Sequence, residues 1–328
     1  MIEKESICLS VLYATIFDKD GKIIAFEFDD ITAAGAYSAY PRTSCVEANQ
    51  VLNIAGGPYN IENFRAKTTV VFQNMVPTSQ YRAVGHPMGI VICDSLLDKA
   101  AVTAGIDRIE IRRRNLVSDD AYPAASPAGI PLHDLSHQAC LEKLVKVIDV
   151  EALKADQADA RQKGIHRGIG YASFIKGTNP GALIYGPAKV PISAQDGTTI
   201  RLEPAGGVTV LTGVTEQGQG TETALAQVVA SAIGLKFEDV RVITGDTNSA
   251  PYGGGTYGSR GAGIGGEASW KAGQTLRKQI LELAGVLLQT EADTLDIHEG
   301  VVINADDRSE RITLAELGNI AFLRSYEL

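Results

Sequence analysis

The sequence lacks most of the features that would place it in a metal-cluster, membrane or secreted class. Its four cysteines, Cys8, Cys45, Cys93 and Cys140, lie far apart and form no C-x-x-C pair. That spacing argues against a zinc finger or an iron-sulfur cluster within this chain and is typical of reduced thiols in a cytoplasmic protein. No apolar run is long enough to span a bilayer. The opening MIEKESICLS carries two acidic residues before any apolar run, unlike a secretory signal.

An excess of positive charge is also missing. The 328 residues include 30 lysines and arginines against 39 aspartates and glutamates, a formal net charge of -9. Binding to phosphates of nucleic acid requires a basic surface, so this balance argues against a nucleic-acid partner. Hydrophobic residues make up 45% of the chain, which is ordinary for a globular protein with a sizeable core. No repeat or low-complexity tract is evident, and the length predicts two domains.

Two β-prone runs, residues 7–17 and 23–28, flank the turn sequence DKDGK and predict a β-hairpin. An isolated hairpin is only marginally stable in water. We therefore expect these strands to join a sheet that is completed further along the chain or by a partner. Residues 67–72, KTTVVF, predict another strand.

The remaining periodic segments predict a mixture of helices and strands. Helices are expected over residues 88–104 with Gly105 as C-cap, 136–150, 150–163, 221–233 and 267–288. Further strands are expected over residues 168–174, 199–202, 208–212 and 240–244. Residues 118–134 predict a loop, and the basic run in residues 107–116 predicts a solvated face or salt bridges between elements. This mixture indicates an α+β fold with two domains, residues 1–160 and 161–328.

A glycine-rich segment stands out in the second half. Eight of the 16 residues from Pro251 to Gly266 are glycine, and the segment lies between a predicted strand and a predicted long helix. Glycine lets the backbone approach a ligand closely, and the N–H groups at the start of a helix attract anions. A structural loop that needs glycine for tight packing is the alternative. The match of Gly261–Gly266 to G-x-G-x-x-G is only formal, because the strand ends well upstream.

Two further loops also lead into predicted helices. TGVTEQGQG, residues 212–220, follows a predicted strand, and SQYRAVGHP, residues 79–87, precedes the helix at 88–104. Glutamine amides such as those of Gln217 and Gln219 can both donate and accept hydrogen bonds. Together the three loops predict the walls of one pocket for a large, phosphate-bearing ligand.

Four segments in order, SQYRAVGHP, IRRRNL, TEQGQGTET and GDTNSAPYGGGTYGSR, resemble the molybdenum-binding subunit of the xanthine dehydrogenase, aldehyde oxidase and carbon monoxide dehydrogenase family. The resemblance covers nearly the whole chain. It implies that residues 1–160 are the C-terminal part of a first molybdopterin-binding domain and residues 161–328 the N-terminal part of a second. It also implies molybdenum held by molybdopterin, as the cytosine dinucleotide, and hydroxylation of an aldehyde or N-heterocycle with water as oxygen donor.

The resemblance also implies three groups of cofactor-binding residues. They are a segment beside the metal, a loop that holds the pterin and its phosphate, and a loop around the pyrophosphate. In this order the groups are Tyr81, Arg82 and Ala83; Gln217, Gly218 and Gln219; and Thr256, Tyr257, Gly258, Ser259, Arg260 and Gly261. Ala83 departs from the family's usual glycine. Variants with cysteine in this loop accompany the copper-bearing carbon monoxide enzymes, so Ala83 argues against carbon monoxide oxidation.

Two motifs of the family are absent from these 328 residues. They are an upstream glycine-aromatic segment and a downstream Gly-Val-Gly-Glu segment, whose glutamate is the general base. Glu267, in GIGGEAS, does not match that motif, so we expect no catalytic residue and no metal ligand in this chain. The chain alone is expected to be inactive, as a split subunit or a fragment. The partners implied are further molybdenum-subunit fragments, a 2Fe-2S subunit, an FAD subunit and a small-molecule substrate.

Two other functions remain open from the residues themselves. One is a non-catalytic scaffold or nucleotide-binding module with the same fold, and the other is a different enzyme that uses the loops for nucleotide phosphate. His86 could line a substrate pocket, whereas His133 and His137 are interpreted as surface residues. We expect Trp270 to lie in the core and residues 246–249 to cap their own loop.

Overall fold

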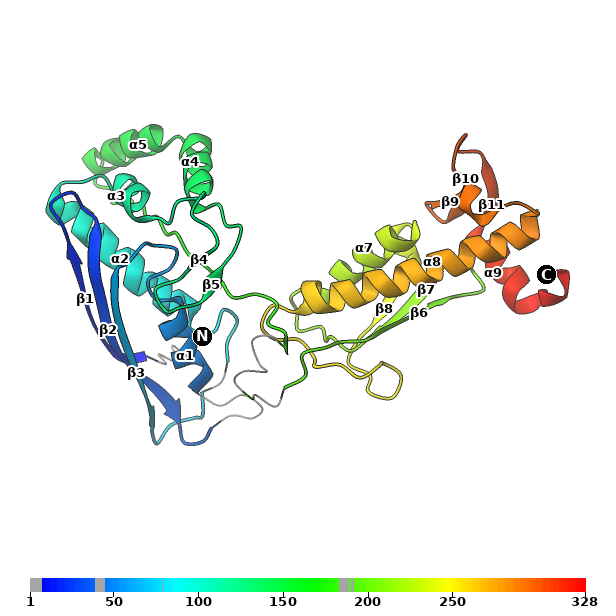
Figure 1. The fold of residues 1–328 in the computed structure, drawn as a ribbon, viewed down its shortest axis with the longest axis horizontal. Coiled ribbons are helices and arrows are strands. Elements are labelled where there is room, and N and C mark those ends of the chain that lie inside the picture. The colour runs from blue at the N-terminus through cyan, green and yellow to red at the C-terminus, as the bar shows by residue number, and fades with distance from the viewer. Residues whose placement is uncertain (1–7, 39–44, 79, 183–188, 190–191) are drawn as a thin grey trace. The chain divides into compact units, whose positions relative to one another are not determined.

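The structure is a computed structural model that describes residues 8–38, 45–78, 80–182, 189 and 192–328 of the chain. The chain forms two compact units, Met1–Lys176 and Gly177–Leu328, each of which is described by itself. Both units combine helices with small sheets, which confirms the predicted α+β class (Figure 1).

The sheet of unit 1 has three strands, β1 (Cys8–Phe17), β2 (Ile23–Gly35) and β3 (Asn63–Phe72), in the order β1-β2-β3. The hairpin is confirmed, because β1 and β2 are antiparallel. Its turn is stabilised by the Asp18 carboxylate, which accepts hydrogen bonds from the N–H groups of Asp20 and Lys22. Strand β3 pairs with β2 in parallel, so the sheet is completed further along the same chain.

Five helices in the described part of unit 1 enclose its core, and the first two of them contact the strands of this sheet. The five are α1 (Cys45–Ile54), α2 (His86–Ala104), α3 (Arg108–Asn115), α4 (His137–Ile148) and α5 (Val150–Gln162). Phe26 and Phe28 from β2 meet Val51, Leu97 and Ile111 in this core. The predicted C-cap of α2 is confirmed, since the residue after Ala104 is in the left-handed region with φ 68°. Residues 118–134 are mostly loop, with the two-residue strands β4 (Ala124–Ala125) and β5 (Pro131–Leu132).

The basic run forms salt bridges between elements, as one of the two sequence interpretations expected. The Arg112 side chain is fully buried, and its guanidinium contacts Asp94 at 3.0 Å and Asp98 at 2.8 Å, which ties α3 to α2. Arg113 pairs with Glu142 of α4. The run therefore stabilises the interior of unit 1 rather than forming only a solvated surface.

The strand predicted over residues 168–174 is wrong, because this segment has no strand in the structure. Side chains bind its backbone instead. The Tyr171 carbonyl accepts a 2.6 Å hydrogen bond from Arg112, and the Ser173 N–H donates to Asp94 at 3.3 Å. Backbone groups that are occupied by buried side chains cannot also form a strand ladder.

Unit 2 contains a second three-stranded sheet, β6 (Thr198–Leu202), β7 (Val208–Thr212) and β8 (Val240–Ile243), in the order β6-β7-β8. Helix α7 (Thr221–Ile233) connects the parallel strands β7 and β8, and α8 (Gly266–Leu288) lies beside α7 (Figure 1). Val210, Val229, Ile233, Ile280 and Ala284 form part of their shared core. The predicted helices and strands of this region are confirmed to within one residue at each end.

The two units share one order of elements. In unit 1 an antiparallel pair, a helix, a parallel strand and a long helix follow one another as β1, β2, α1, β3 and α2. Unit 2 repeats this order as β6, β7, α7, β8 and α8. The loops before α2 and α8 therefore occupy equivalent places in their units, although the sequence shows no evident repeat.

Two features of unit 2 were not anticipated correctly. The antiparallel sheet of β9 (Leu295–His298), β10 (Val301–Asn304) and β11 (Glu310–Thr313), with α9 (Leu314–Leu323), has no counterpart in the sequence predictions. The expected core position of Trp270 is wrong, because its side chain is 45% exposed. Helices α7 and α8 approach closely at Gly273, where an added Cβ would lie 2.7 Å from Ala232, so small residues form the contact and Trp270 lies outside it.

The buried cation of unit 1 yields a first prediction. Arg112→Ala should lower the free energy of unfolding by about 3–5 kcal/mol, because it leaves the buried carboxylate of Asp94 without its counter-charge. Arg114→Ala, which removes a partly exposed pair with Glu110 on the same helix, should cost less than about 1 kcal/mol. Urea denaturation followed by circular dichroism measures both. Equal losses in the two variants would contradict the structural role of Arg112.

Candidate functional site

The predicted cofactor-binding residues divide between the two units. The segment of Tyr81, Arg82 and Ala83 belongs to unit 1, directly before α2. The other two groups, residues 217–219 and 256–261, belong to unit 2, before α7 and α8 respectively. Within unit 2 the structure brings these two groups into direct contact.

In the loop before α2, two of the three predicted residues are exposed and the third is partly buried. Tyr81 is 79% exposed and Arg82 is also exposed, whereas Ala83 is partly buried. The buried His86 places its Nδ1 atom 2.7 Å from the Ala83 carbonyl and 2.9 Å from the Val84 carbonyl. A protonated Nδ1 donates to these oxygens, so His86 holds the loop in shape.

Close packing against α1 restricts the same loop. Gly85 has φ 72°, and an added Cβ would lie 2.4 Å from the Glu47 carbonyl oxygen. The Gly85 N–H donates to the Glu47 carboxylate at 3.3 Å. Burial raises the pKa of Glu47, and the hydrogen bond from Gly85 acts in the opposite direction. Ala83 itself has φ 82°, a conformation that suits the glycine it replaces.

The loop before α7 gathers four backbone donors around one carboxylate. The Glu216 Oε1 atom accepts hydrogen bonds from the N–H groups of Gln217, Gly218 and Gly220 at 3.0, 2.7 and 3.1 Å. Its Oε2 atom accepts one from the Glu222 N–H at 3.0 Å. These backbone donors hold the pKa of Glu216 below its usual range. The loop is therefore built to bind anionic oxygen atoms.

Two glycines make this loop conformation possible. Gly218 and Gly220 have φ 85° and 84°, and the space beside each α-carbon is open. The Gln219 amide oxygen accepts a hydrogen bond from the Gln217 N–H at 2.6 Å, and its amide nitrogen donates to Thr221 Oγ1 at 2.7 Å. Gln219 thus supports the loop from within.

The loops before α7 and α8 are joined through Thr256. Its hydroxyl accepts a hydrogen bond from the Thr215 N–H at 2.9 Å and lies 2.7 Å from the Thr215 carbonyl, to which it can donate. The Gln217 side chain donates to the Thr256 carbonyl at 3.0 Å. Three hydrogen bonds therefore hold the two loops side by side, and the one from Gln217 joins the two predicted groups directly.

The Arg260 side chain faces inward. Its guanidinium is fully buried, donates to the Gln195 carbonyl at 2.6 Å, contacts Asp196 at 3.0 Å and lies 5.0 Å from the centre of the Tyr257 ring. The Tyr257 hydroxyl donates to the Ser193 carbonyl. These two side chains shape the glycine-rich loop from inside, so their contribution to ligand binding would come through its backbone.

Glycine is required where the loop surrounds this ion pair. A Cβ on Gly254 would lie 1.9 Å from the Arg260 guanidinium, and one on Gly253 would lie 2.3 Å from the Asp196 carboxylate. Gly213, from the end of β7, is equally close to Asp196, at 2.4 Å. Part of the glycine content is thus explained by close packing, which was the alternative interpretation of the sequence.

Sequence reasoning missed Asp196. Its carboxylate accepts a hydrogen bond from the Gly197 N–H at 3.0 Å and contacts Arg260. Burial raises the pKa of Asp196, and the charge of Arg260 acts in the opposite direction. In the sequence Asp196 precedes a glycine, a dipeptide that indicates only a turn. No local pattern connects it to an arginine 64 residues later.

The remaining residues of the glycine-rich loop form its turn into α8. Gly258 and Ser259 have φ 56° and 58°, and the Gly258 carbonyl accepts a hydrogen bond from the Asn179 N–H at 2.9 Å. Gly261 begins a π-helical turn, Gly261–Gly265, that continues into α8. The loop thus enters the helix through left-handed and π-helical backbone rather than through a side-chain cap.

The described residues contain no group of three or more histidine, cysteine, aspartate or glutamate side chains that could hold a metal ion. His133 is exposed, and His137 lies 3.0 Å from the Phe174 carbonyl. Asp246 accepts hydrogen bonds from Asn248 and Ser249, which confirms its capping role. No helix in the described part of the chain is long and apolar enough to cross a membrane.

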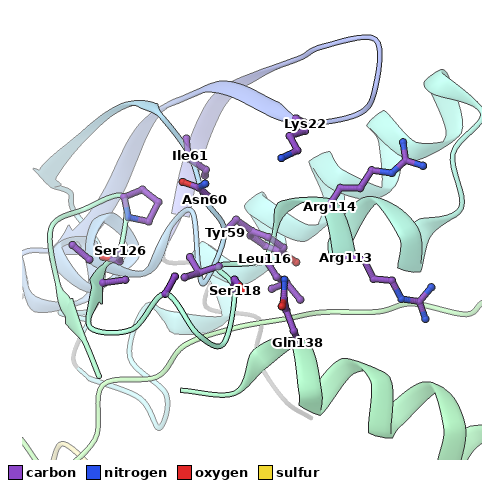
Figure 2. A pocket seen from close by; sticks show the side chains of 15 residues that line it. Lys22, Tyr59, Asn60, Ile61, Arg113, Arg114, Leu116, Ser118, Ser126 and Gln138 are labelled. Atoms are coloured by element: carbon purple, nitrogen blue, oxygen red, sulfur yellow. The ribbon is translucent and has the colours of Figure 1, made fainter. Parts of the chain in front are cut away.

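Unit 1 contains a cavity of about 550 Å³. Figure 2 shows Lys22, Tyr59, Arg113 and Gln138 around it. None of the predicted cofactor-binding residues lines this cavity. It therefore does not serve as the predicted pocket.

Comparison with protein families gives two matches. Residues 143–328, more than half of the chain, match the model of a molybdopterin cofactor-binding domain. Residues 8–116 match a second model that is also described as a molybdopterin cofactor-binding domain. The matched ranges include all three groups of predicted residues.

Individual relatives point to the same kind of protein. The chain is 27% identical to the nicotine 6-hydroxylase large subunit of Paenarthrobacter nicotinovorans, over 94% of this chain and 38% of the relative. It is 29% identical to the xanthine dehydrogenase molybdenum-binding subunit of Escherichia coli O157:H7, over 93% and 39%. The solved structure of quinoline 2-oxidoreductase from Pseudomonas putida 86 is 31% identical, with a TM-score of 0.82, over 96% and 40%. The chain thus spans about two fifths of each of these relatives.

The conformation of Ala83 leads to a second prediction. Ala83→Gly should raise the free energy of unfolding by about 1 kcal/mol, because glycine adopts a positive φ without the clash of a Cβ. Ala83→Val at the same site should lower it, since a β-branched residue fits this region worst. Urea denaturation of the three proteins tests the order. A stabilising valine would show that the loop does not adopt this conformation.

The buried ion pair of unit 2 leads to a third prediction. Asp196→Ala should lower the free energy of unfolding by about 3–5 kcal/mol, because it leaves Arg260 buried without a counter-charge. The double variant with Arg260→Ala should lose less than the sum of the single losses. Lys271→Ala, which breaks an exposed pair with Glu267, is the control and should cost less than about 1 kcal/mol. Additive losses in the double variant would exclude coupling between the two charges.

Proposed function

Since this chain belongs to the family of molybdopterin cofactor-binding domains, we propose that it forms part of the molybdenum-binding subunit of a molybdenum hydroxylase. The observation that carries the proposal is the anion-binding loop of residues 216–222, which lies within the matched domain and touches the glycine-rich loop through Thr256. The relatives named above are a hydroxylase and two oxidoreductases, which supports the reaction class.

The proposed substrate is an aldehyde or an N-heterocycle, hydroxylated with water as oxygen donor. Relatives named for nicotine and quinoline favour the N-heterocycle. Ala83, in place of the cysteine that accompanies copper-bearing enzymes, argues against carbon monoxide as substrate. The side chains that select among heterocycles would come partly from segments outside these 328 residues.

The residues of unit 2 fit a phosphate-bearing cofactor. Four N–H groups already converge on the Glu216 carboxylate, whose two oxygens resemble those of a phosphate in charge and spacing. The open space beside Gly218 and Gly220 allows a bulky group to approach the backbone. We assign the cofactor as molybdopterin cytosine dinucleotide, which supplies the molybdenum at which oxygen transfer takes place.

The chain's own residues would bind and orient this cofactor. The family resemblance implies that residues 217–219 would donate to the pterin and its phosphate, that residues 256–261 would surround the pyrophosphate, and that residues 81–83 would belong to the segment beside the metal. Arg260 acts from inside its loop, by holding the backbone in shape through Asp196. No residue of this chain acts as the general base, which would come from another part of the molybdenum subunit.

The proposal includes partners that carry electrons away from the substrate. They are the rest of the molybdenum subunit, a 2Fe-2S subunit and an FAD subunit, in a cytoplasmic complex. The name of one relative, a 6-hydroxypseudooxynicotine dehydrogenase complex subunit gamma, supports a multi-subunit arrangement.

A fourth prediction tests the proposed function. The chain purified with its partners should contain molybdenum and pterin, measured by elemental analysis and by the fluorescence of the oxidised pterin. Gly218→Ala should lower both at least about tenfold, since a backbone shift in this loop removes its donors from the cofactor. Gly164→Ala is the matched control, because Gly164 also has a positive φ and open space but lies outside the loops.

The same measurement separates the alternatives. A complex free of molybdenum and pterin would overturn the proposal. Binding of ATP or NAD by that metal-free protein would instead indicate a nucleotide-binding module with this fold. Equal cofactor loss in the two glycine variants would show that general destabilisation, rather than the loop, causes the loss.

A further inference from the structure

Three of the four donors of the 216–222 loop, the N–H groups of Gly218, Gly220 and Glu222, donate to the carboxylate of Glu216, and the Gln217 N–H is shared between Glu216 and the amide oxygen of Gln219. The N-cap residue of helix α7 is Gly220, which has no side chain that could cap the helix. The side chain of Glu216, four residues earlier in the chain, reaches the first turn of the helix and takes the place of such a cap. A usual N-cap side chain binds one or two N–H groups, whereas this carboxylate binds four.

These donors overlap with those that the proposed function assigns to the cofactor. Gln217 and Gly218 are common to both sets, and Gly220 and Glu222 continue the same turn. A backbone N–H carries one hydrogen and cannot direct it fully at two anionic oxygens. Two negative groups at the same donors would also repel each other. The loop can therefore hold either the Glu216 carboxylate or the anionic group of a cofactor.

The Glu216 side chain is able to leave this position. It is accessible to water, so its charge is solvated as soon as it turns outward. The carboxylate of Glu222, on the same turn, differs from that of Glu216 in its partners. It accepts a hydrogen bond from the Thr244 hydroxyl at 2.9 Å and from none of the four N–H groups.

We propose that Glu216 is an internal substitute for the cofactor's anionic group, which holds the 216–222 loop in its binding conformation and is displaced when that group binds. This inference rests on the proposed function and adds a residue to it. The carboxylate satisfies the four donors in the empty protein and competes with the incoming anion at the same time. Removal of its charge should therefore strengthen anion binding at this loop.

Inorganic phosphate is the probe for this competition. The amide signals of Gly218, Gly220 and Glu222 are followed by NMR as phosphate is added to the whole chain, free of cofactor, at pH 7. Glu216→Gln should bind phosphate roughly 3- to 10-fold more tightly than the unsubstituted protein. The reason is that the state in which the N–H groups of the loop are free to bind phosphate becomes the dominant one. Glu222→Gln removes the same charge from the same turn but leaves the carboxylate of Glu216 in place, so its affinity should change less than about twofold.

Three outcomes would overturn the inference. Equal strengthening in the two variants would show that only long-range charge matters. Weaker binding by Glu216→Gln, with unchanged amide signals elsewhere, would show that the carboxylate supports the loop and does not compete. An absence of phosphate-dependent shifts in Glu216→Gln would exclude the loop as an anion site for this probe. Each of these leaves the proposed function standing if the purified complex contains molybdenum and pterin, so the two failures are distinguishable.

Discussion

The glycine-rich loop of unit 2 depends on the ion pair between Arg260 and Asp196. Both side chains are fully buried, and burial of a charge is tolerated only when a counter-charge and hydrogen bonds replace water. The carbonyl groups of Ser193 and Gln195 and the N–H group of Gly197 supply those hydrogen bonds. The backbone must therefore pass within contact distance of the pair, and only residues without a Cβ can do so at Gly213, Gly253 and Gly254.

Glycine thus serves two separate purposes in unit 2. Around Asp196 it makes room for a buried charge, whereas at Gly218 and Gly220 it permits a left-handed backbone beside open space. The first purpose explains the stability of one loop, and the second leaves N–H groups of the other loop accessible to an anion. Thr256 connects the two loops by hydrogen bonds to Thr215. The ion pair between Arg260 and Asp196, which fixes the glycine-rich loop, therefore also supports the loop that carries the donors at the start of α7.

Local patterns in the sequence were sufficient for much of the fold. The apolar periodicity and flanking glycines of α7 located it to the residue, and the turn at Asp18 located the hairpin. The character of the candidate site was also predictable, because glycine and glutamine before a helix indicate backbone donors. Residue types alone could not tell which way a side chain points, so the sequence did not show that the guanidinium of Arg260, a predicted cofactor-binding residue, lies inside the loop and pairs with Asp196.

The features that the sequence predictions missed or placed wrongly share a physical cause, which is contact between residues far apart in the chain. Residues 168–174 have a strand-like composition, yet Arg112 and Asp94 take their backbone groups. Trp270 is a large aromatic residue of the kind usually found in a core, but the close contact between α7 and α8 at Gly273 leaves its side chain at the surface. Asp196 gave no signal because its partner is 64 residues away. The short strands β9 to β11, four residues each, have too little periodicity to be distinguished from turns.

The shared order of elements in the two units has a consequence for how such loops can diversify. In each unit the segment between the parallel strand and the long helix is fixed at both ends by the sheet and the helix pair, yet residues 73–85 form a short connection and residues 244–265 a much longer one. The same order of strands and helices thus accommodates connections of different lengths. Insertions and exchanges can therefore accumulate there during evolution and alter ligand preference while the scaffold of either unit stays the same.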